Sequence, residues 1–222
     1  LFEVVLRRGW AQLAERTLAL CKMIERRMWL SQTPLRQFAS LPPEVLHHLD
    51  RQCVDMDHLY QNTSQELGAL VAAPQLGYTL FRHVHAFPRC ALSVGVTPVT
   101  RTCLKLDLAV AADFKFSRDV HGGAVGWWVL VEDGDGEKLL HHEYLAMKEV
   151  AATKPLYVTF TVPVAEPLPP QYFIKVVADR WLGAATTLPV SLRHLTLPEK
   201  FPPHTDLFDL KPLPLASLNV PE

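Results

Sequence analysis

The chain has 222 residues, of which 49% are hydrophobic and 20% charged, and these proportions exclude a disordered tail in favour of a folded protein with one large domain or a few small ones. The formal net charge of −1 excludes a polycation that coats nucleic acid through bulk charge alone. No apolar run approaches the roughly 20 residues that a membrane-spanning helix needs, so we expect no membrane partner.

Residues 1–30 have the periodicity of one long amphipathic helix, which Pro34 brings to an end. The chain opens inside this pattern, without an initiator Met or a basic signal sequence, so we expect a piece cut from a longer protein. A single helix cannot bury its apolar face alone, and its missing partners are expected upstream. That face comprises Phe2, Leu6, Trp10, Leu13, Thr17, Leu20, Ile24 and Met28, and the opposite face comprises Arg8, Gln12, Glu15, Lys22 and Arg26.

Positive charge is concentrated at this end of the chain. Residues 1–36 hold seven Lys or Arg but three Asp or Glu, so a surface that contacts phosphate is expected here. Trp10 lies at the edge of the apolar face, one turn after Arg7. An indole beside a guanidinium suits a single-stranded base, because the ring stacks on the base while the cation meets phosphate. Arg8 is a weaker candidate because it turns away from Trp10, and the alternative is a Trp10 buried at a helix crossing.

Residues 41–89 are typical of a cluster of short helices that forms a helix-loop-helix unit. Its hairpin could present backbone amides to a phosphate, but packing of the unit against the long helix is the interpretation that we favour. The signals are a start at Pro42-Pro43, a cap at Asp55 or Asp57, a capping box from Thr63 to Glu66, a break at Pro74–Gly77 and a last helix over Tyr78–Ala86.

From Cys90 onward the hydrophobic period changes to two, which predicts about seven short strands. Two sheets packed face to face would bury the apolar sides of these strands, so we predict a sandwich of immunoglobulin or fibronectin type over residues 90–197. Trp127 and Trp128 indicate a strong core with one ring available for a seam. Residues 198–222 contain six prolines and are expected to form an extended tail or linker. Expected strands include 92–96, 104–110, 127–131, 139–145, 156–162, 171–178 and 188–196, with a hairpin turn over 132–137.

The residue types that could act in catalysis or bind a metal ion do not form a recognisable site in this sequence. His141 and His142 would point to opposite faces of a strand, and the turn from Asp133 to Glu137 lacks the glycine position and distal Glu of a calcium loop. Without a Gly-rich phosphate loop, a helicase box or a nucleophile–base pair, we expect no catalytic residue, metal site or cofactor in this chain. We expect the four Cys residues, which lack metal or disulfide spacing, to be buried thiols in a reducing compartment: Cys21, Cys53, Cys90 and Cys103.

Several stretches resemble the Sec63 homology region of large nuclear RNA helicases. Leu168–Leu182 and Leu197–Pro203 carry the resemblance most specifically. Leu1–Trp10 and Leu20–Trp29 are similar to the long "ratchet" helix of the helical bundle in Ski-two-like RNA helicases. The similarity covers essentially the whole chain and favours the first helicase cassette of the spliceosomal branch of that family.

The resemblance implies an α+β multidomain fragment: a ratchet-type helix with the end of a helical bundle over residues 1–40, a helix-loop-helix unit over 41–89 and an immunoglobulin-like sandwich over 90–197. It implies a non-catalytic accessory region of a nuclear ATP-dependent RNA helicase for pre-mRNA splicing, whose motor domains hold ATP and Mg. Trp10, Arg7 and Arg8 would contact a translocating small nuclear RNA strand, and the sandwich would dock the motor domains or other spliceosomal proteins. The alternative is a pure protein-interaction scaffold without RNA contact, as in the signal cointegrator complex helicase or the endoplasmic reticulum translocon subunit.

Overall fold

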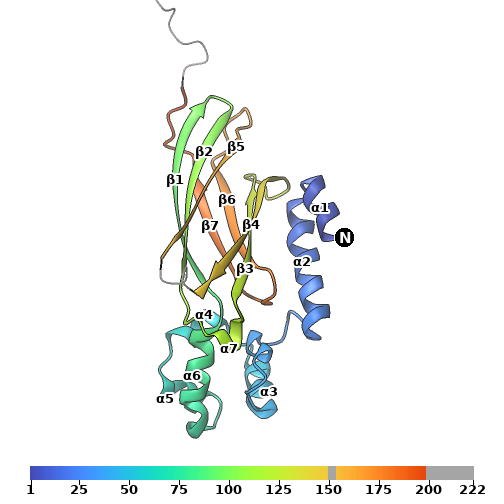
Figure 1. The fold of residues 1–222 in the computed structure, drawn as a ribbon, viewed down its shortest axis with the longest axis vertical. Coiled ribbons are helices and arrows are strands. Elements are labelled where there is room, and N and C mark those ends of the chain that lie inside the picture. Colours follow the sequence, from blue (N-terminus) through green and yellow to red (C-terminus); the bar gives the residue numbers. More distant parts are fainter. Residues whose placement is uncertain (150–153, 199–222) are drawn as a thin grey trace, which may run out of the picture.

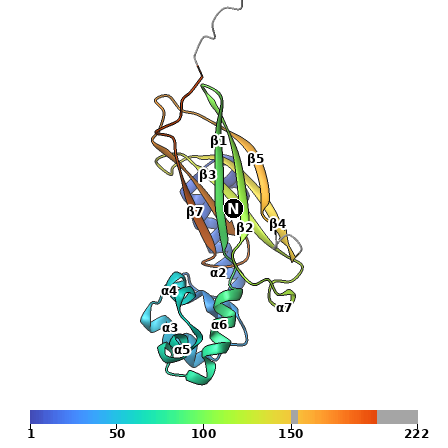
Figure 2. The ribbon, with the colours of Figure 1, turned by 90° about the vertical axis from the view of Figure 1, so that its left-hand side faces the viewer.

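The computed structural model describes residues 1–149 and 154–198 and combines helices with two antiparallel sheets, which confirms the predicted mixture of helix and sheet (Figure 1). Two helices, α1 (Phe2–Arg8) and α2 (Ala11–Arg26), lie along one side of the sheets (Figures 1 and 2). Four more cluster at one end of the molecule: α3 (Pro43–Gln52), α4 (Met56–Gln61), α5 (Ser64–Leu70) and α6 (Gly77–Ala86). The expected proline-rich tail lies, beyond Pro198, outside the described residues.

The prediction of one continuous helix over residues 1–30 is wrong, because the chain breaks between α1 and α2. Gly9 is left-handed, with φ 70°, and ends α1 by donating its backbone N–H to the Leu6 carbonyl at 3.0 Å. Trp10 is extended, with φ −89° and ψ 96°, and precedes α2. Glycine has no Cβ to oppose the left-handed conformation, so it favours a helix end even where the apolar period continues. α2 ends at Arg26, and Pro34 starts a short 3₁₀ helix, η1 (Pro34–Gln37).

α2 packs on the sheet through the face opposite to the predicted one. Ala14 and Leu18 pack on Leu130 and Val177 of the sheet, and Lys22 is buried on the same side of the helix. Small side chains on this face allow the helix to approach the sheet closely, and the sheet supplies polar partners for the charged ones. Three of the side chains predicted to be inside face away from the sheet: Leu13 is 46% exposed, Leu20 44% and Ile24 69%. Leu6, Thr17 and Met28 are buried as predicted.

The helical cluster follows the signals in the sequence. Thr63 and Glu66 form the predicted capping box, in which the Thr63 N–H donates to the Glu66 carboxylate at 2.7 Å. A short 3₁₀ helix, η2 (Pro74–Leu76), separates α5 from α6. A Cβ atom on Gly77 would overlap the Ser64 carbonyl oxygen, so glycine is what permits the close approach of α5 and α6.

The described residues form seven strands, the number that the sequence predicts. One sheet has the order β1-β2-β5 and the other has the order β4-β3-β6-β7, with antiparallel neighbours throughout. A short helix, α7 (Arg118–His121), precedes β3. The strands are β1 (Cys90–Thr100), β2 (Cys103–Ala112), β3 (Ala124–Glu132), β4 (Leu139–Lys148), β5 (Leu156–Pro163), β6 (Gln171–Ala178) and β7 (Ala185–Ser191).

The two sheets share one apolar core that continues into the helical cluster. Leu106 of β2 and Trp127 of β3 are fully buried in it, as the alternating patterns of these strands predict. At the end near the helices, the Trp181 ring meets Phe87 with centroids 5.9 Å apart and Phe38 at 5.3 Å. The sheets and the helical cluster are therefore held together by one continuous set of buried side chains.

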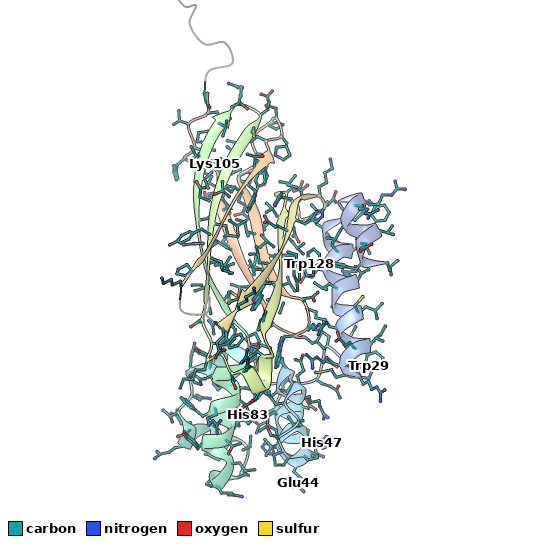
Figure 3. All side chains as sticks on the ribbon, viewed as in Figure 1. Trp29, Glu44, His47, His83, Lys105 and Trp128 are labelled. Carbon is teal, nitrogen blue, oxygen red and sulfur yellow. The ribbon has the colours of Figure 1, made fainter. Side chains whose placement is uncertain are left out.

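Trp128 lies at the seam between the sheet and α1, which confirms the prediction that one ring of the Trp pair occupies a seam (Figure 3). Its ring meets Phe2 edge to face with centroids 5.2 Å apart, and its indole N–H donates to the Asp179 carboxylate at 2.9 Å. The side chain therefore joins α1, β3 and the segment after β6.

Candidate nucleic-acid interface

The break between α1 and α2 is hydrogen-bonded to the β3–β4 hairpin. Leu139 donates its backbone N–H to the Gly9 carbonyl at 2.8 Å, and Ala11 donates to the Glu137 carbonyl at 3.0 Å. Trp10 thereby pairs with Lys138 as an isolated antiparallel bridge. The extended backbone at Trp10 acts as a short additional strand beside the hairpin, so its position is fixed by the sheet and not by helix periodicity.

Trp10 is half-exposed, with 49% of its surface accessible, and it lines a shallow hollow with Gln12, Leu13 and Glu137. It therefore lies outside the buried core, which is the position that a stacking contact requires. Because Trp10 is not helical, the i, i+3 spacing that placed it one turn after Arg7 does not apply across the break.

Arg7 and Arg8 are both exposed in the last turn of α1. Among the described residues the guanidinium groups that lie over an aromatic ring are those of Arg26, over Trp181, and Arg89, over Tyr60. The three candidate RNA-contacting residues thus share one exposed segment, but no arginine within residues 1–149 and 154–198 stacks on the Trp10 ring. Their contact with RNA stays a prediction.

Charged groups hold the other face of α2 against the sheet, a feature that the sequence pattern did not reveal. Lys175 donates to Glu15 at 2.8 Å and lies 3.1 Å from the buried Glu132 carboxylate. Burial tends to lower the pKa of Lys175, but the two carboxylates outweigh burial and raise it. For Glu132 the effect of burial is the larger one: burial raises the pKa of this carboxyl, although Lys175 acts to lower it. This group bridges α2, β3 and β6 and fixes the rotation of α2 about its axis.

Lys22 reinforces this attachment. Its ammonium donates to the Ala178 carbonyl at 2.9 Å and to the Trp181 carbonyl at 3.4 Å. Burial lowers the pKa of Lys22 to about 8, and the nearby carboxylates of Asp179 and Glu15 offset part of that effect.

With α2 fixed in this rotation, its outward face presents an apolar stripe defined here as Leu13, Leu20 and Ile24. Arg16 is exposed beside the stripe and Arg27 follows at the end of the helix. Trp29, just beyond, is 71% exposed and points away from the sheets (Figure 3). This mixture of apolar and basic side chains is available to a strand or to a protein partner.

The hairpin of the helical cluster offers little to a phosphate. Its backbone amides at Ala73, Leu76 and Gly77 donate to the carbonyls of Gly68, Ala73 and Pro74 within the hairpin. Because these donors are used internally, the structure does not favour phosphate binding. The favoured packing against the long helix is wrong as well, because the buried side chains of the unit belong to the core that it shares with the sheets and not to the cluster that holds α1 and α2.

The expected buried thiols are wrong for half of the Cys residues. Cys21 and Cys53 are exposed, Cys90 is buried and Cys103 is half-buried, and all four are free. Burial, followed by the nearby Asp113 carboxylate, raises the pKa of Cys90 to about 12, so its thiol stays protonated.

His141 and His142 point to opposite sides of β4, as predicted. His141 stacks on Phe160 of the core with ring centroids 4.3 Å apart, whereas His142 is exposed. Within residues 1–149 and 154–198 no three His, Cys, Asp or Glu side chains are arranged to hold a metal ion. In the same ranges no helix combines the length and apolar character needed to cross a membrane.

Comparison with known proteins identifies the family. Among solved structures, one match is the sensor domain of the anti-sigma factor RsgI4 from Pseudobacteroides cellulosolvens, which is 15% identical over 46% of this chain and 94% of that chain. Its TM-score of 0.29 is too low to support an inference. Residues 1–191, by contrast, match the Sec63 Brl domain.

Curated relatives agree with that match. The chain is 51% identical to the U5 small nuclear ribonucleoprotein 200 kDa helicase of Homo sapiens, over 98% of this chain and 10% of that protein. It is 50% identical to the protein of the same name from Drosophila melanogaster, over 100% of this chain and 10% of that protein. It is 49% identical to the DExH-box ATP-dependent RNA helicase DExH12 of Arabidopsis thaliana, with the same coverage of 100% and 10%. The chain spans about a tenth of the length of these relatives, and it belongs to the Sec63 Brl domain family.

Proposed function

We propose that this chain is a non-catalytic accessory region of a nuclear ATP-dependent RNA helicase that acts in pre-mRNA splicing. The observation that carries the proposal is the identity of about half of its residues to U5 small nuclear ribonucleoprotein helicases along essentially the whole chain. ATP and Mg would be bound by motor domains elsewhere in such a helicase, and this region would position the RNA strand relative to them.

In this proposal α1 and α2 form the ratchet element that contacts a small nuclear RNA strand. The half-exposed Trp10 ring would stack on a base, which is worth about 1–3 kcal/mol per base. Arg7 and Arg8, exposed in the preceding turn, would meet phosphate oxygens. The hydrogen bonds that fix the backbone around Trp10 to the β3–β4 hairpin support this role, because a backbone that is already ordered loses less entropy when the ring stacks.

The two sheets would form an immunoglobulin-like or fibronectin-like sandwich that docks the motor domains or other spliceosomal proteins. The seven antiparallel strands and their division into β1-β2-β5 and β4-β3-β6-β7 support that description. α1 and α2 lie along the second sheet only, and in the described part of the chain no helix covers the outer face of the first sheet, which would be available to a partner (Figure 2). Tyr157 of β5, 79% exposed, lies on that open face.

The test is duplex unwinding by the helicase that carries this chain, with Trp10 changed to Ala and RNA-stimulated ATP hydrolysis measured on the same sample. Loss of one stacked base should slow unwinding by about fivefold or more while ATP hydrolysis is retained. Tyr78→Ala is the control, because it removes another exposed aromatic ring on α6, in the helical cluster and outside the proposed contact. Unwinding at the wild-type rate by both Trp10→Ala and Arg7→Ala variants would contradict the RNA contact.

A pure protein-interaction scaffold is the second candidate, and the apolar stripe of Leu13, Leu20 and Ile24 favours it, because aliphatic side chains suit a protein surface better than a base. A salt titration separates the two functions. Phosphate contacts make RNA affinity fall steeply as salt rises, whereas a scaffold has no RNA affinity to lose.

A further inference from the structure

A polar hollow of about 310 Å³ lies where the end of α2, α7, the start of β3 and the segment after β6 meet. Its lining includes the side chains of Arg26, Tyr144, Asp179 and Arg180. Arg26 is the last residue of α2, whereas Trp10 precedes the first, so about 24 Å of helix separates this hollow from the proposed RNA contact. The hollow is therefore a distinct place on the surface.

Two contacts orient Arg26 while most of its hydrogen-bond donors remain available. Its Nε donates to the Arg180 carbonyl at 3.0 Å, and its guanidinium lies 5.4 Å from the centroid of the Trp181 ring. Trp181 is itself only 6% exposed and is packed in the core. No hydrogen bond from the two terminal nitrogens of Arg26 reaches another residue in the described part of the chain. Such a fixed planar fork matches the oxygens of a phosphate or carboxylate.

The remaining groups leave this hollow with an excess of one positive charge. Arg180 is exposed and has no carboxylate partner among residues 1–149 and 154–198. Asp179 is the one carboxylate in the lining, and it accepts the indole N–H of Trp128 at 2.9 Å. His121 adds no free donor, because its Nε2 lies 2.7 Å from the Ala86 carbonyl and its Nδ1 contacts the Ser117 backbone.

Tyr144 of β4 also lines the hollow. Its ring packs against Trp128 with centroids 5.1 Å apart, and its hydroxyl lies over Gly126, where a Cβ atom would overlap it. Glycine at this position leaves room for the hydroxyl, which can donate to an oxygen in the hollow. The lining thus offers two guanidinium groups and one phenol from three separate parts of the chain.

We propose that this hollow binds a single oxyanion, the phosphoryl or carboxylate group of a side chain on a partner protein. Arginine clusters that recognise phosphorylated or acidic peptides use the same chemistry. A protein segment is favoured over RNA because nucleic-acid surfaces carry an extended excess of positive charge, whereas this hollow has a net excess of one and includes Asp179.

The experiment is an NMR titration of the 222-residue chain with a pentapeptide that carries a central phosphoserine. Two reporters are available at the hollow: the indole N–H of Trp128 and the backbone amide of Gly122. We expect saturable shifts of both signals, weaker binding by the same peptide with Glu at the centre, and no binding by the unmodified Ser peptide. Absence of saturable shifts with the phosphopeptide and the Glu peptide would overturn the proposal.

Three variants with the same change in charge sharpen the result. Arg180→Gln, which keeps the backbone carbonyl that Arg26 uses, should weaken phosphopeptide binding at least about tenfold. Arg26→Gln should weaken it by at least as much, and Arg27→Gln, next in the chain but outside the lining, should leave it unchanged. Equal weakening by all three variants would show attraction by general charge and overturn the site. Tighter binding of hexameric oligouridylate to the same reporters would overturn the choice of a protein ligand.

Discussion

Replacement of Lys22 by Met tests which face of α2 is attached to the sheet. Lys22 is only 4% exposed, and its ammonium depends on the carbonyls of Ala178 and Trp181 for hydrogen bonds. Met has a similar length and fills the same space without a charge, so the variant removes the titration of Lys22 while preserving the packing of its aliphatic chain.

The magnitude follows from the pKa of Lys22, which burial lowers from 10.5 to about 8 in the folded chain. Between these values the unfolded state binds more protons than the folded state, so stability rises with pH. One pKa unit corresponds to about 1.4 kcal/mol, so the charged amine costs the folded chain about 3 kcal/mol near pH 7. Raising the pH to 10 should recover about 2–3 kcal/mol of this cost in the wild type and none of it in Lys22→Met.

The assay is urea unfolding followed by circular dichroism at pH 7 and pH 10, with the wild type compared with Lys22→Met at each pH. Other groups titrate in this range, but they contribute equally to both proteins and cancel in the difference. Lys148→Met, at an exposed position on β4, is the control and should behave like the wild type. An identical pH dependence in wild type and Lys22→Met would mean that Lys22 is solvated, and our account of how α2 is attached would be refuted.

Three further outcomes can be measured by equilibrium unfolding of the same chain. Lys175→Met should lower the free energy of unfolding by about 3–5 kcal/mol, because it leaves the buried Glu132 carboxylate without its partner. Glu15→Ala, at a more exposed position, should lower it by less than about 1 kcal/mol, and similar losses from both variants would argue against a buried ion pair. Burial lowers the pKa of His121, so the unfolded chain takes up a proton more readily and the free energy of unfolding should fall as the pH drops below about 6.5. His121→Gln should reduce that fall, and an unchanged dependence of stability on pH would mean that the ring is in solvent. Gly77→Ala should destabilise by more than the roughly 1 kcal/mol typical of a point mutant, because its Cβ would overlap the backbone of α5; a neutral effect would contradict that packing.

The sequence predicted well those elements whose formation depends on residues close to one another in the chain. The capping box of Thr63 and Glu66 and the start of α3 at Pro43 depend on residues within one turn of each other. The alternation of Leu104, Leu106 and Leu108 depends on the strand period alone. Such signals need no knowledge of the rest of the chain, so short helices and strands were found close to their observed positions.

The rotation of α2 could not be predicted in the same way, because it depends on a surface that forms more than 150 residues later. Lys22 bonds to carbonyls at Ala178 and Trp181, which are separated from it by 156 and 159 positions. Backbone carbonyls leave no trace in a hydrophobic pattern, so the pattern placed the charged face in solvent. The break at Gly9 did have a local signal, since glycine inside a helical pattern marks a possible end, but the continuing apolar period outweighed it.

The candidate site shows the same division. Trp10 was identified from its residue type and its basic neighbours, and it does lie on the surface. The polar hollow was not predicted, because Arg26 and the Arg180 carbonyl are 154 positions apart and the family resemblance of the stretches that contain them gives neither side chain a role.

The attachment of Trp10 to the β3–β4 hairpin has a mechanical consequence. β3 is an interior strand, bonded to β4 on one side and β6 on the other, so the hairpin cannot move without shearing the ladder between β3 and β6. A pull applied to the Trp10 ring would pass through the backbone at Gly9 and Ala11 into that sheet, instead of bending the joint between two short helices. The residue that interrupts the helix is therefore anchored more firmly than a residue in an uninterrupted helix would be.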